Sequence, residues 1–493
     1  MSNGQCKVDQ SEADLNDDQC EDRLAGDYGT TRLSTRSSFA ERLLEDLIIR
    51  PKPSSLPRAA FNLFKGTVGG GAFLIPTAYT EAGYAFGPVI ALLCGVMVID
   101  CASMVLRAKQ RIARLKVQTY PEVAEFVFGR PMFFAISAAL ATSQLGFVLI
   151  YLQFAAGLIR HLVPPFDESY PILVVAGALV VTPMTFLSGN LRALGASSAV
   201  ASVGVFYCLM ATLGYSIASI QQHSRACSSE AIVDPAKWIM FTASSVTVIE
   251  GIGVVLPIEN SVRNPEKFPV VLRATLSGII AIYLVYGVVG YLAYGSALNV
   301  SLISIIPPSP LATTVQVAMA AQLLLTAPLQ FVPAIQIVDR ALGVKSHMIL
   351  KSPKAWFARL GIMAILTTMA SFMGPAFLGL LLAFIGSLAA TFMAVTLPGL
   401  LEVFTERVLR LESGRSLTGD PSPGHEGDEV EQPKASFTCR FRKVRAGLYV
   451  VVGVGVAVVG TVTCVVQAIH FHHNEDAAIH RNAHDPLANV TYC

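Results

Sequence analysis

Two glycine-rich stretches, each followed by a proline, lie inside segments that are otherwise apolar. The first is KGTVGGGAFLIP, residues 65–76, and the second is SVTVIEGIGVVLPIEN, residues 245–260. In a helix interior glycine costs about 1 kcal/mol relative to alanine, and proline about 3 kcal/mol. A helix interrupted at membrane depth frees backbone N–H and C=O groups, which are tolerated only where protein or a water-filled cavity surrounds them.

The freed backbone groups have the chemistry needed to bind a small zwitterion. The N-terminus of a half-helix attracts a carboxylate, while free carbonyls attract a cation or an ammonium group. A single glycine run could equally serve close helix packing, but paired interruptions in two halves of a chain indicate a transporter's substrate site. The predicted site consists of Thr67, through its hydroxyl, and Val68, Gly69, Gly70, Gly71, Glu250, Gly251, Ile252 and Gly253.

Three polar side chains inside apolar segments are candidates for coupling an ion to transport. Glu250 adjoins the second interruption, and two interpretations stay open: it takes up a proton, or it caps the freed amides. An acid in the membrane is costly and often marks an ion pathway, and burial favours its protonated form. For Asp100 a structural hydrogen bond is favoured over coupling, and for Thr326 a kink at Pro328 is slightly favoured over an ion contact.

The composition indicates how these residues are positioned. Hydrophobic residues make up 53% of the chain and charged residues only 14%, whereas soluble proteins carry about 25% charged residues. Apolar blocks reach the roughly 20 residues that a membrane helix needs, and none alternates like a barrel strand. We therefore predict a polytopic, all-α membrane protein. Its eleven spans are expected at 59–80, 85–107, 132–160, 171–188, 194–219, 237–258, 269–294, 311–338, 356–374, 375–400 and 446–469.

The basic residues predict the orientation of these spans. Lys and Arg concentrate on one side, which is cytosolic by the positive-inside rule and carries the N-terminus. The basic segments are 107–116, 260–273, 339–359 and 439–445; the opposite loops 161–170 and 295–310 contain no Lys or Arg. Two glycosylation sequons, at Asn299 and Asn489, are expected on the non-cytosolic side with the C-terminus.

Composition also divides the chain into five parts. A polar, then basic N-terminal tail precedes a ten-helix core, and a Gly/Pro/Ser-rich acidic loop separates an eleventh helix from it. The predicted parts are a disordered cytosolic tail at 1–57, a transport core at 58–400, a flexible cytosolic loop at 401–445, the eleventh helix at 446–470 and a non-cytosolic tail at 471–493.

Motifs for other chemistry are absent from the sequence. The nine cysteines form no CxxC pair, and there is no phosphate loop, no HExxH and no channel-filter repeat. We therefore expect neither an enzyme nor a metal site, no nucleic-acid partner, and no cofactor besides a coupling ion. H⁺ is preferred as that ion and Na⁺ stays open. Cys227 and Cys493, the two non-cytosolic cysteines, could form a disulfide.

Five segments together resemble the amino acid/auxin permease family, and most closely its proton-assisted amino acid transporter branch. They are GTVGGGAFLIP (66–76), QLGFVLIYLQFAAGLI (144–159), VIEGIGVVLPIENSVRNPEKFP (248–269), GYLAYG (290–295) and QLLLTAPLQFVPAIQIVD (322–339). The resemblance runs in order from about residue 58 to residue 470. The EGIGxVLPxEN stretch is the most specific part of it.

The resemblance implies a LeuT-like inverted repeat of five plus five helices, with helices 1 and 6 broken and an eleventh helix added. It also implies amino acid transport, commonly driven by protons. Tyr151 and Phe154 match aromatic positions that face the site in the family. Two positions depart from the branch: Gly70 replaces a threonine, and Asn62 stands where animal proton-coupled members carry a histidine.

The leading hypothesis is thus a secondary active amino acid transporter that works by alternating access in the plasma membrane or a vacuolar or lysosomal membrane. The resemblance implies that it is an H⁺ symporter. The alternative is an amino acid sensor that signals through its cytosolic tail. The expected partners are an amino acid and the lipid bilayer. The identity of the amino acid, the direction of flux and the oligomeric state stay open.

Overall fold

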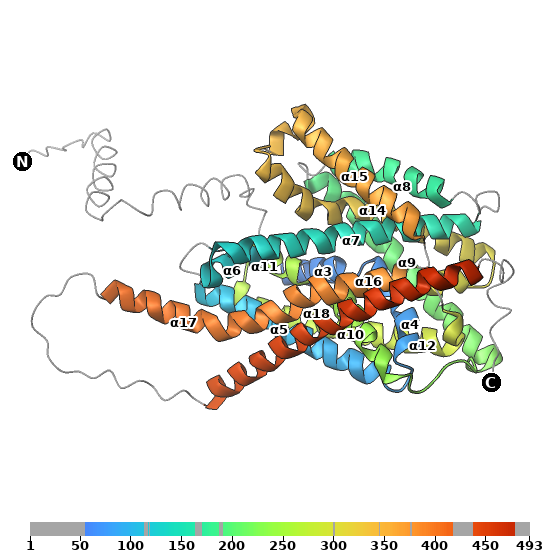
Figure 1. Cartoon of the computed structure of the whole chain (residues 1–493), viewed down its shortest axis with the longest axis horizontal. Coiled ribbons are helices and arrows are strands. Elements are labelled where there is room, and N and C mark those ends of the chain that lie inside the picture. Colours follow the sequence, from blue (N-terminus) through green and yellow to red (C-terminus); the bar gives the residue numbers. More distant parts are fainter. Residues whose placement is uncertain are drawn as a thin grey trace, which may run out of the picture. The chain divides into compact units, whose positions relative to one another are not determined.

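In the computed structural model, every regular element of the described residues is a helix (Figure 1). The described residues are 55–112, 117, 119–162, 170–186, 191–298, 301–344, 346–374, 377–417 and 437–478. Among them, nine helical segments are long and apolar enough to cross a membrane, and Tyr170–Thr185 is a shorter apolar helix. The chain is therefore a polytopic membrane protein. The tail up to residue 54 and both sequon asparagines lie outside the described residues.

Both glycine-rich segments are interrupted helices. In the first, Val68 and Gly69 are extended, with φ/ψ of −86°/104° and −128°/−161°. In the second, Glu250 is extended at −62°/123°, and Gly251 leaves helical geometry at −149°/15°. The first segment consists of α3 (Leu56–Thr67), η1 (Gly70–Leu74), α4 (Ile75–Ala78) and η2 (Tyr79–Glu81); the second of α10 (Trp238–Ile249) and α11 (Ile252–Ser261). The predicted interruptions are present in both.

The remaining helices begin and end at recognisable sequence signals. Proline stands in the first turn of several, and Thr119 with Glu122 forms a capping box at the start of α6. Gly374, with φ of 68°, ends α15 near the predicted cut. These helices are α5 (Gly87–Ile112), α6 (Tyr120–Phe128), α7 (Arg130–Leu162), α8 (Tyr170–Thr185), α9 (Leu191–His223), α12 (Phe268–Tyr294), α14 (Pro310–Ala341), α15 (Pro353–Met373), α16 (Leu378–Ile385), α17 (Leu397–Leu417) and α18 (Phe437–Ala478).

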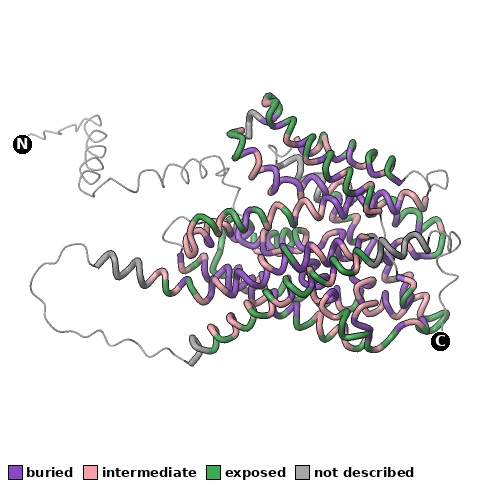
Figure 2. The backbone as a smooth tube through the Cα atoms, viewed as in Figure 1, coloured by how far each residue is buried: buried purple, intermediate pink, exposed green. Residues whose placement is uncertain are grey.

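The helices pack through buried faces and turn apolar faces outward. The helix α7 packs against α14, α14 against α9, and α12 against α5. Figure 2 shows exposed positions along the outer sides of α8, α15 and α18. Several of these carry large apolar side chains, among them Leu179 at 68%, Phe372 at 86% and Val451 at 69% exposed. Contiguous exposed apolar surface marks a membrane contact, so these faces are the ones that meet lipid.

The loop predicted at 401–445 is shorter than its composition indicated. The helix α17 continues to Leu417, and α18 begins at Phe437 and runs to Ala478, beyond the predicted helix 446–470. The reason is tertiary, because Glu402 and Thr405 in α17 are buried and Arg442 in α18 pairs with Glu402. Polar residues that would be solvated in a loop are held here by partners on neighbouring helices.

Candidate functional site: two interrupted helices

The two interruptions lie against each other. The helix α3 contacts α11, and α10 contacts both α4 and η1. A Cβ on Gly251 would collide with Oγ1 of Thr67, the last residue of α3. A Cβ on Gly66 would lie 3.0 Å from a methyl of Val254 in α11. The structure therefore brings the two predicted halves of the site together through glycines that leave no room for side chains.

Tyr151 of α7 lies over the first interruption. Its Oη accepts a hydrogen bond from the N–H of Gly70 and one of 3.4 Å from Nε2 of Gln330 in α14. A Cβ on Gly69 would lie 2.6 Å from the same Oη, and one on Gly70 would lie 2.9 Å from the Tyr151 ring. The tyrosine therefore satisfies an amide that the broken helix leaves free, and its contact with a substrate stays a prediction.

Glu250 caps the second half-helix. Its carboxylate accepts hydrogen bonds from the backbone N–H groups of Ile252 and Gly253, the first amides of α11, and the residue is only 8% exposed. The first amides of a helix have no intrahelical partner and carry partial positive charge. The carboxylate of Glu250 thus occupies the place where the carboxylate of a substrate would bind most favourably.

One polar atom at the junction is buried without a partner. Oγ1 of Thr67 is buried and makes no hydrogen bond within the described residues. A buried hydroxyl without a partner costs about 1–3 kcal/mol. Because this oxygen faces Gly251 across the two interruptions, it is available to a polar group of a ligand.

The other predicted site residues have different positions. Phe154 lies one helical turn beyond Tyr151 in α7 and is 1% exposed. Thr326 donates its hydroxyl hydrogen to the carbonyl of Gln322 at 2.8 Å, which is an ordinary bond within α14. Asp100 is held by Arg445 of α18, with Nε 2.9 Å from Oδ2. Asp100 is thus in an ion pair and Thr326 in a bond within its own helix, and a coupling role for either residue stays a prediction.

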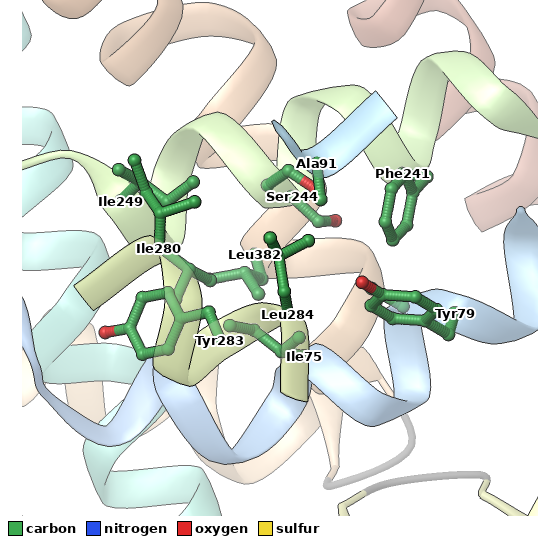
Figure 3. Close-up of a pocket in the computed structure, with 13 residues that line it drawn as sticks. Ile75, Tyr79, Ala91, Phe241, Ser244, Ile249, Ile280, Tyr283, Leu284 and Leu382 are labelled. Atoms are coloured by element: carbon green, nitrogen blue, oxygen red, sulfur yellow. The ribbon is translucent and has the colours of Figure 1, made fainter. Parts of the chain in front are cut away.

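A small cavity adjoins the interruptions (Figure 3). Its volume is about 20 Å³, which is room for a single water molecule. At one end the rings of Tyr79 and Phe241 meet edge to face with centroids 5.0 Å apart, and Tyr283 lies toward the other end. The lining residues are Ile75, Ala78, Tyr79, Ala91, Phe241, Ser244, Ser245, Val248, Ile249, Ile280, Tyr283, Leu284 and Leu382. None of them is charged, and this cavity is too small for an amino acid.

The structure adds residues that the sequence pattern did not single out. Gln330 reaches Tyr151 from α14, and the hydroxyls of Tyr79 and Tyr283 are buried without hydrogen bonds within the described residues. Glu81, at the end of the first interrupted segment, also has a buried oxygen without such a bond, and Lys237 is the charge that acts on it. These residues lie outside the two glycine-rich motifs, and their proximity depends on how α7, α12 and α14 pack, so the local sequence gave no signal for them.

The comparisons with known proteins agree with this geometry. The family described as "Transmembrane amino acid transporter protein" matches residues 52–408. Vacuolar amino acid transporter 3 of Saccharomyces cerevisiae is 28% identical over 297 residues, covering 59% of this chain and 42% of the yeast protein. Vacuolar amino acid transporter 3 of Schizosaccharomyces pombe is 23% identical over 301 residues, covering 60% of this chain and 45% of that protein.

A plant relative matches over a larger share of its own length. Amino acid transporter AVT3A of Arabidopsis thaliana is 23% identical over 297 residues, covering 59% of this chain and 69% of the plant protein. The aligned part spans less than half the length of the two yeast relatives. The family and these relatives are transporters and not enzymes. With its family match extending over both interrupted helices, the chain belongs to the transmembrane amino acid transporter family.

Proposed function

We propose that the chain is a secondary active amino acid transporter that works by alternating access with H⁺ as the coupling ion. The observation that carries the proposal is the contact between two interrupted helices at Thr67 and Gly251. Half-helix ends at the middle of a membrane protein supply positive and negative backbone dipoles to one small ligand. Amino acids are the ligand class in the names of the relatives.

The substrate we propose is an amino acid with an uncharged side chain. Its carboxylate would bind at the N-terminal amides of α11, and its ammonium group at the last carbonyls of α3. In this proposal the side chain of the substrate extends toward the uncharged cavity beside Ile75 and Ile249. A charged side chain there would lose its hydration without finding a partner.

Glu250 is the proposed proton acceptor, and its cap suggests how coupling operates. The ionised carboxylate holds the amides of Ile252 and Gly253, and a substrate carboxylate requires the same amides. Protonation removes the charge of Glu250 and weakens its hold on them. A proton would therefore bind before the amino acid, and the two would be released together.

The proposed architecture is an inverted repeat of five plus five helices followed by α18 as the eleventh span. In this arrangement the interrupted first segment and α8 are added to the nine long candidate spans, which gives eleven spans in all. The proposed orientation places the N-terminus in the cytosol. The vacuolar relatives favour the membrane of a vacuole or lysosome over the plasma membrane.

The proposal is tested by uptake of labelled amino acids into proteoliposomes with an imposed pH gradient. The wild-type chain should accumulate neutral amino acids only when the gradient is present. Glu250→Gln keeps the side-chain shape but cannot ionise, so it should lose gradient-driven accumulation while still exchanging amino acids between the two sides. Glu230→Gln, at an exposed carboxyl of the loop before α10, is the matched control and should behave as wild type.

The outcomes separate the parts of the proposal. No flux of any amino acid in either assay would refute the transporter assignment. If gradient-driven uptake survives in Glu250→Gln, Glu250 is not the proton acceptor and serves only to cap the first amides of α11. If uptake then failed in Glu81→Gln, the buried carboxyl at the end of the first segment would be the proton acceptor instead.

A further inference from the structure

A cluster of charged side chains joins α5, α17 and α18, none of which belongs to the two interrupted segments. We call it the α5–α17–α18 cluster. Its members are Asp100, Arg107, Arg111, Glu402, Glu406, Arg442, Lys443 and Arg445. The helix α17 contacts both α5 and α18 in the same region (Figure 1).

The acids of the cluster are shared among more cations than they can neutralise. Glu402, whose side chain is 2% exposed, contacts Arg442 and lies 3.5 Å from Nε of Arg107 and 3.7 Å from Nη2 of Arg111. Glu406 lies 3.1 Å from Nζ of Lys443. Three carboxylates thus face five cations among the described side chains, which leaves two positive charges in excess.

Several guanidinium nitrogens of the cluster remain without hydrogen bonds. Nε and Nη2 of Arg107, Nη1 of Arg111 and Nε of Arg445 are buried and make none within the described residues. These nitrogens lie near carboxylate oxygens of the cluster, but they make no hydrogen bonds to them. The side chains that carry the excess charge are partly exposed, at 32% for Arg107, 24% for Arg111 and 37% for Lys443. An anion with several acceptor oxygens can therefore reach the cluster and neutralise the excess charge.

The cluster lies where apolar spans end and lipid-facing surface begins. Arg107 and Arg111 are in the last turns of α5, and Arg442, Lys443 and Arg445 come immediately before the apolar part of α18. On α18 the neighbouring side chains are apolar and exposed: Phe441 at 59%, Val444 at 66% and Leu448 at 58%. They recur at helical spacing and form a lipid-facing stripe beside the cations.

We propose that the α5–α17–α18 cluster binds the phosphate group of an anionic phospholipid, whose acyl chains lie along the stripe of Phe441, Val444 and Leu448. Basic pockets between membrane helices can hold such head groups. Arginine forks match phosphate oxygens in geometry and charge. A free phosphate ion would satisfy the charge but would leave the apolar stripe unused, so the lipid is the assigned ligand.

The test measures lipid retention by the purified full-length chain in native mass spectrometry, with phosphatidylserine competing against phosphatidylcholine. The wild type should retain phosphatidylserine preferentially. Arg111→Gln combined with Lys443→Gln should weaken that retention about 30-fold, since each basic residue near an anionic lipid contributes roughly fivefold. Lys443→Gln alone should weaken it about fivefold and serves if the double variant does not fold.

Matched variants decide the interpretation. Lys351→Gln combined with Lys354→Gln removes two exposed charges at the start of α15 and should leave retention unchanged. Arg111→Lys combined with Lys443→Arg keeps the charges and should retain most of the binding. Equal weakening in the Lys351/Lys354 pair would refute a specific site. Displacement of the lipid by inorganic phosphate or glycerophosphoserine at comparable concentration would refute the lipid assignment.

Discussion

At the scale of single residues, two glycines act through the space they leave empty. Gly70 and Gly251 are not at positive φ, so their backbone conformation is open to other residues. What excludes a side chain is the approach of Leu323 and Tyr151 to Gly70 and of Thr67 to Gly251. The missing Cβ atoms allow the two interrupted helices and α7 to meet.

Gly70→Ala should therefore reduce amino acid uptake strongly and destabilise the protein by about 1–3 kcal/mol, because the added methyl overpacks a closed junction. Gly278→Ala is the matched control in α12, where a Cβ would have nothing within 4 Å. It should leave uptake unchanged and, if anything, stabilise the helix by up to about 1 kcal/mol. Proteoliposome uptake and thermal unfolding in detergent measure both effects. Equal losses in the two variants would show that any methyl added to a helix glycine is harmful here.

The two membrane acids show what residue type leaves undetermined. Glu250 and Asp100 are both carboxyls inside apolar spans, and their cost in the membrane is similar. The first meets backbone amides of an interrupted helix, and the second meets Arg445 of α18, 345 positions later in numbering. The groups that each carboxylate contacts therefore distinguish Glu250, a candidate proton acceptor, from Asp100, a member of a structural ion pair.

At the scale of elements, α14 and α15 are tied by a buried ion pair. Nη1 and Nη2 of Arg359 donate to the two carboxylate oxygens of Asp339 at 2.9 and 2.7 Å, and Arg359 is fully buried. Its guanidinium also lies 5.5 Å from the ring of Phe186, the residue that follows α8. Three helices therefore converge on one cation.

Asp339→Ala should destabilise the protein by about 3–5 kcal/mol, because it leaves the charge of Arg359 buried and unpaired. Asp339→Leu combined with Arg359→Met removes both charges and should recover most of that loss. The free energy of unfolding in detergent, from a denaturant titration, measures the difference. If the double variant is as unstable as Asp339→Ala, the geometry of the pair itself is what holds the three helices.

At the scale of the whole molecule, one cysteine in the loop before α10 takes part in a disulfide. Cys227 is disulfide-bonded, whereas Cys94, Cys101, Cys208 and Cys464 are free and buried. The proposed topology leaves Cys493 as the cysteine on the same side of the membrane as Cys227. We therefore propose Cys493 as its partner.

Peptide mapping of the non-reduced protein by mass spectrometry should recover the Cys227–Cys493 linkage. In Cys493→Ser, a maleimide that cannot cross membranes should label Cys227 from the non-cytosolic side, since the thiol loses its partner. Cys464→Ser is the control and should leave Cys227 unlabelled. Labelling of Cys227 in the wild type, or from the cytosolic side, would contradict the pairing or the orientation.

The amino-acid sequence by itself determined the class of the protein and the places where its helices break. Long apolar blocks are committed to membrane helices because unpaired backbone is costly in lipid, and glycine with proline breaks a helix through local energetics. The family followed from the order of the same motifs, and the match over residues 52–408 confirmed it.

Only the tertiary structure decided which groups the breaks meet. It placed Tyr151 over Gly70, Thr67 against Gly251 and the carboxylate of Glu250 on the amides of α11. It also extended α17 into the predicted loop, because charged partners on α5 and α18 hold residues that composition assigned to solvent. Such contacts join positions far apart in the chain and depend on how whole helices pack, which no local pattern of residues encodes.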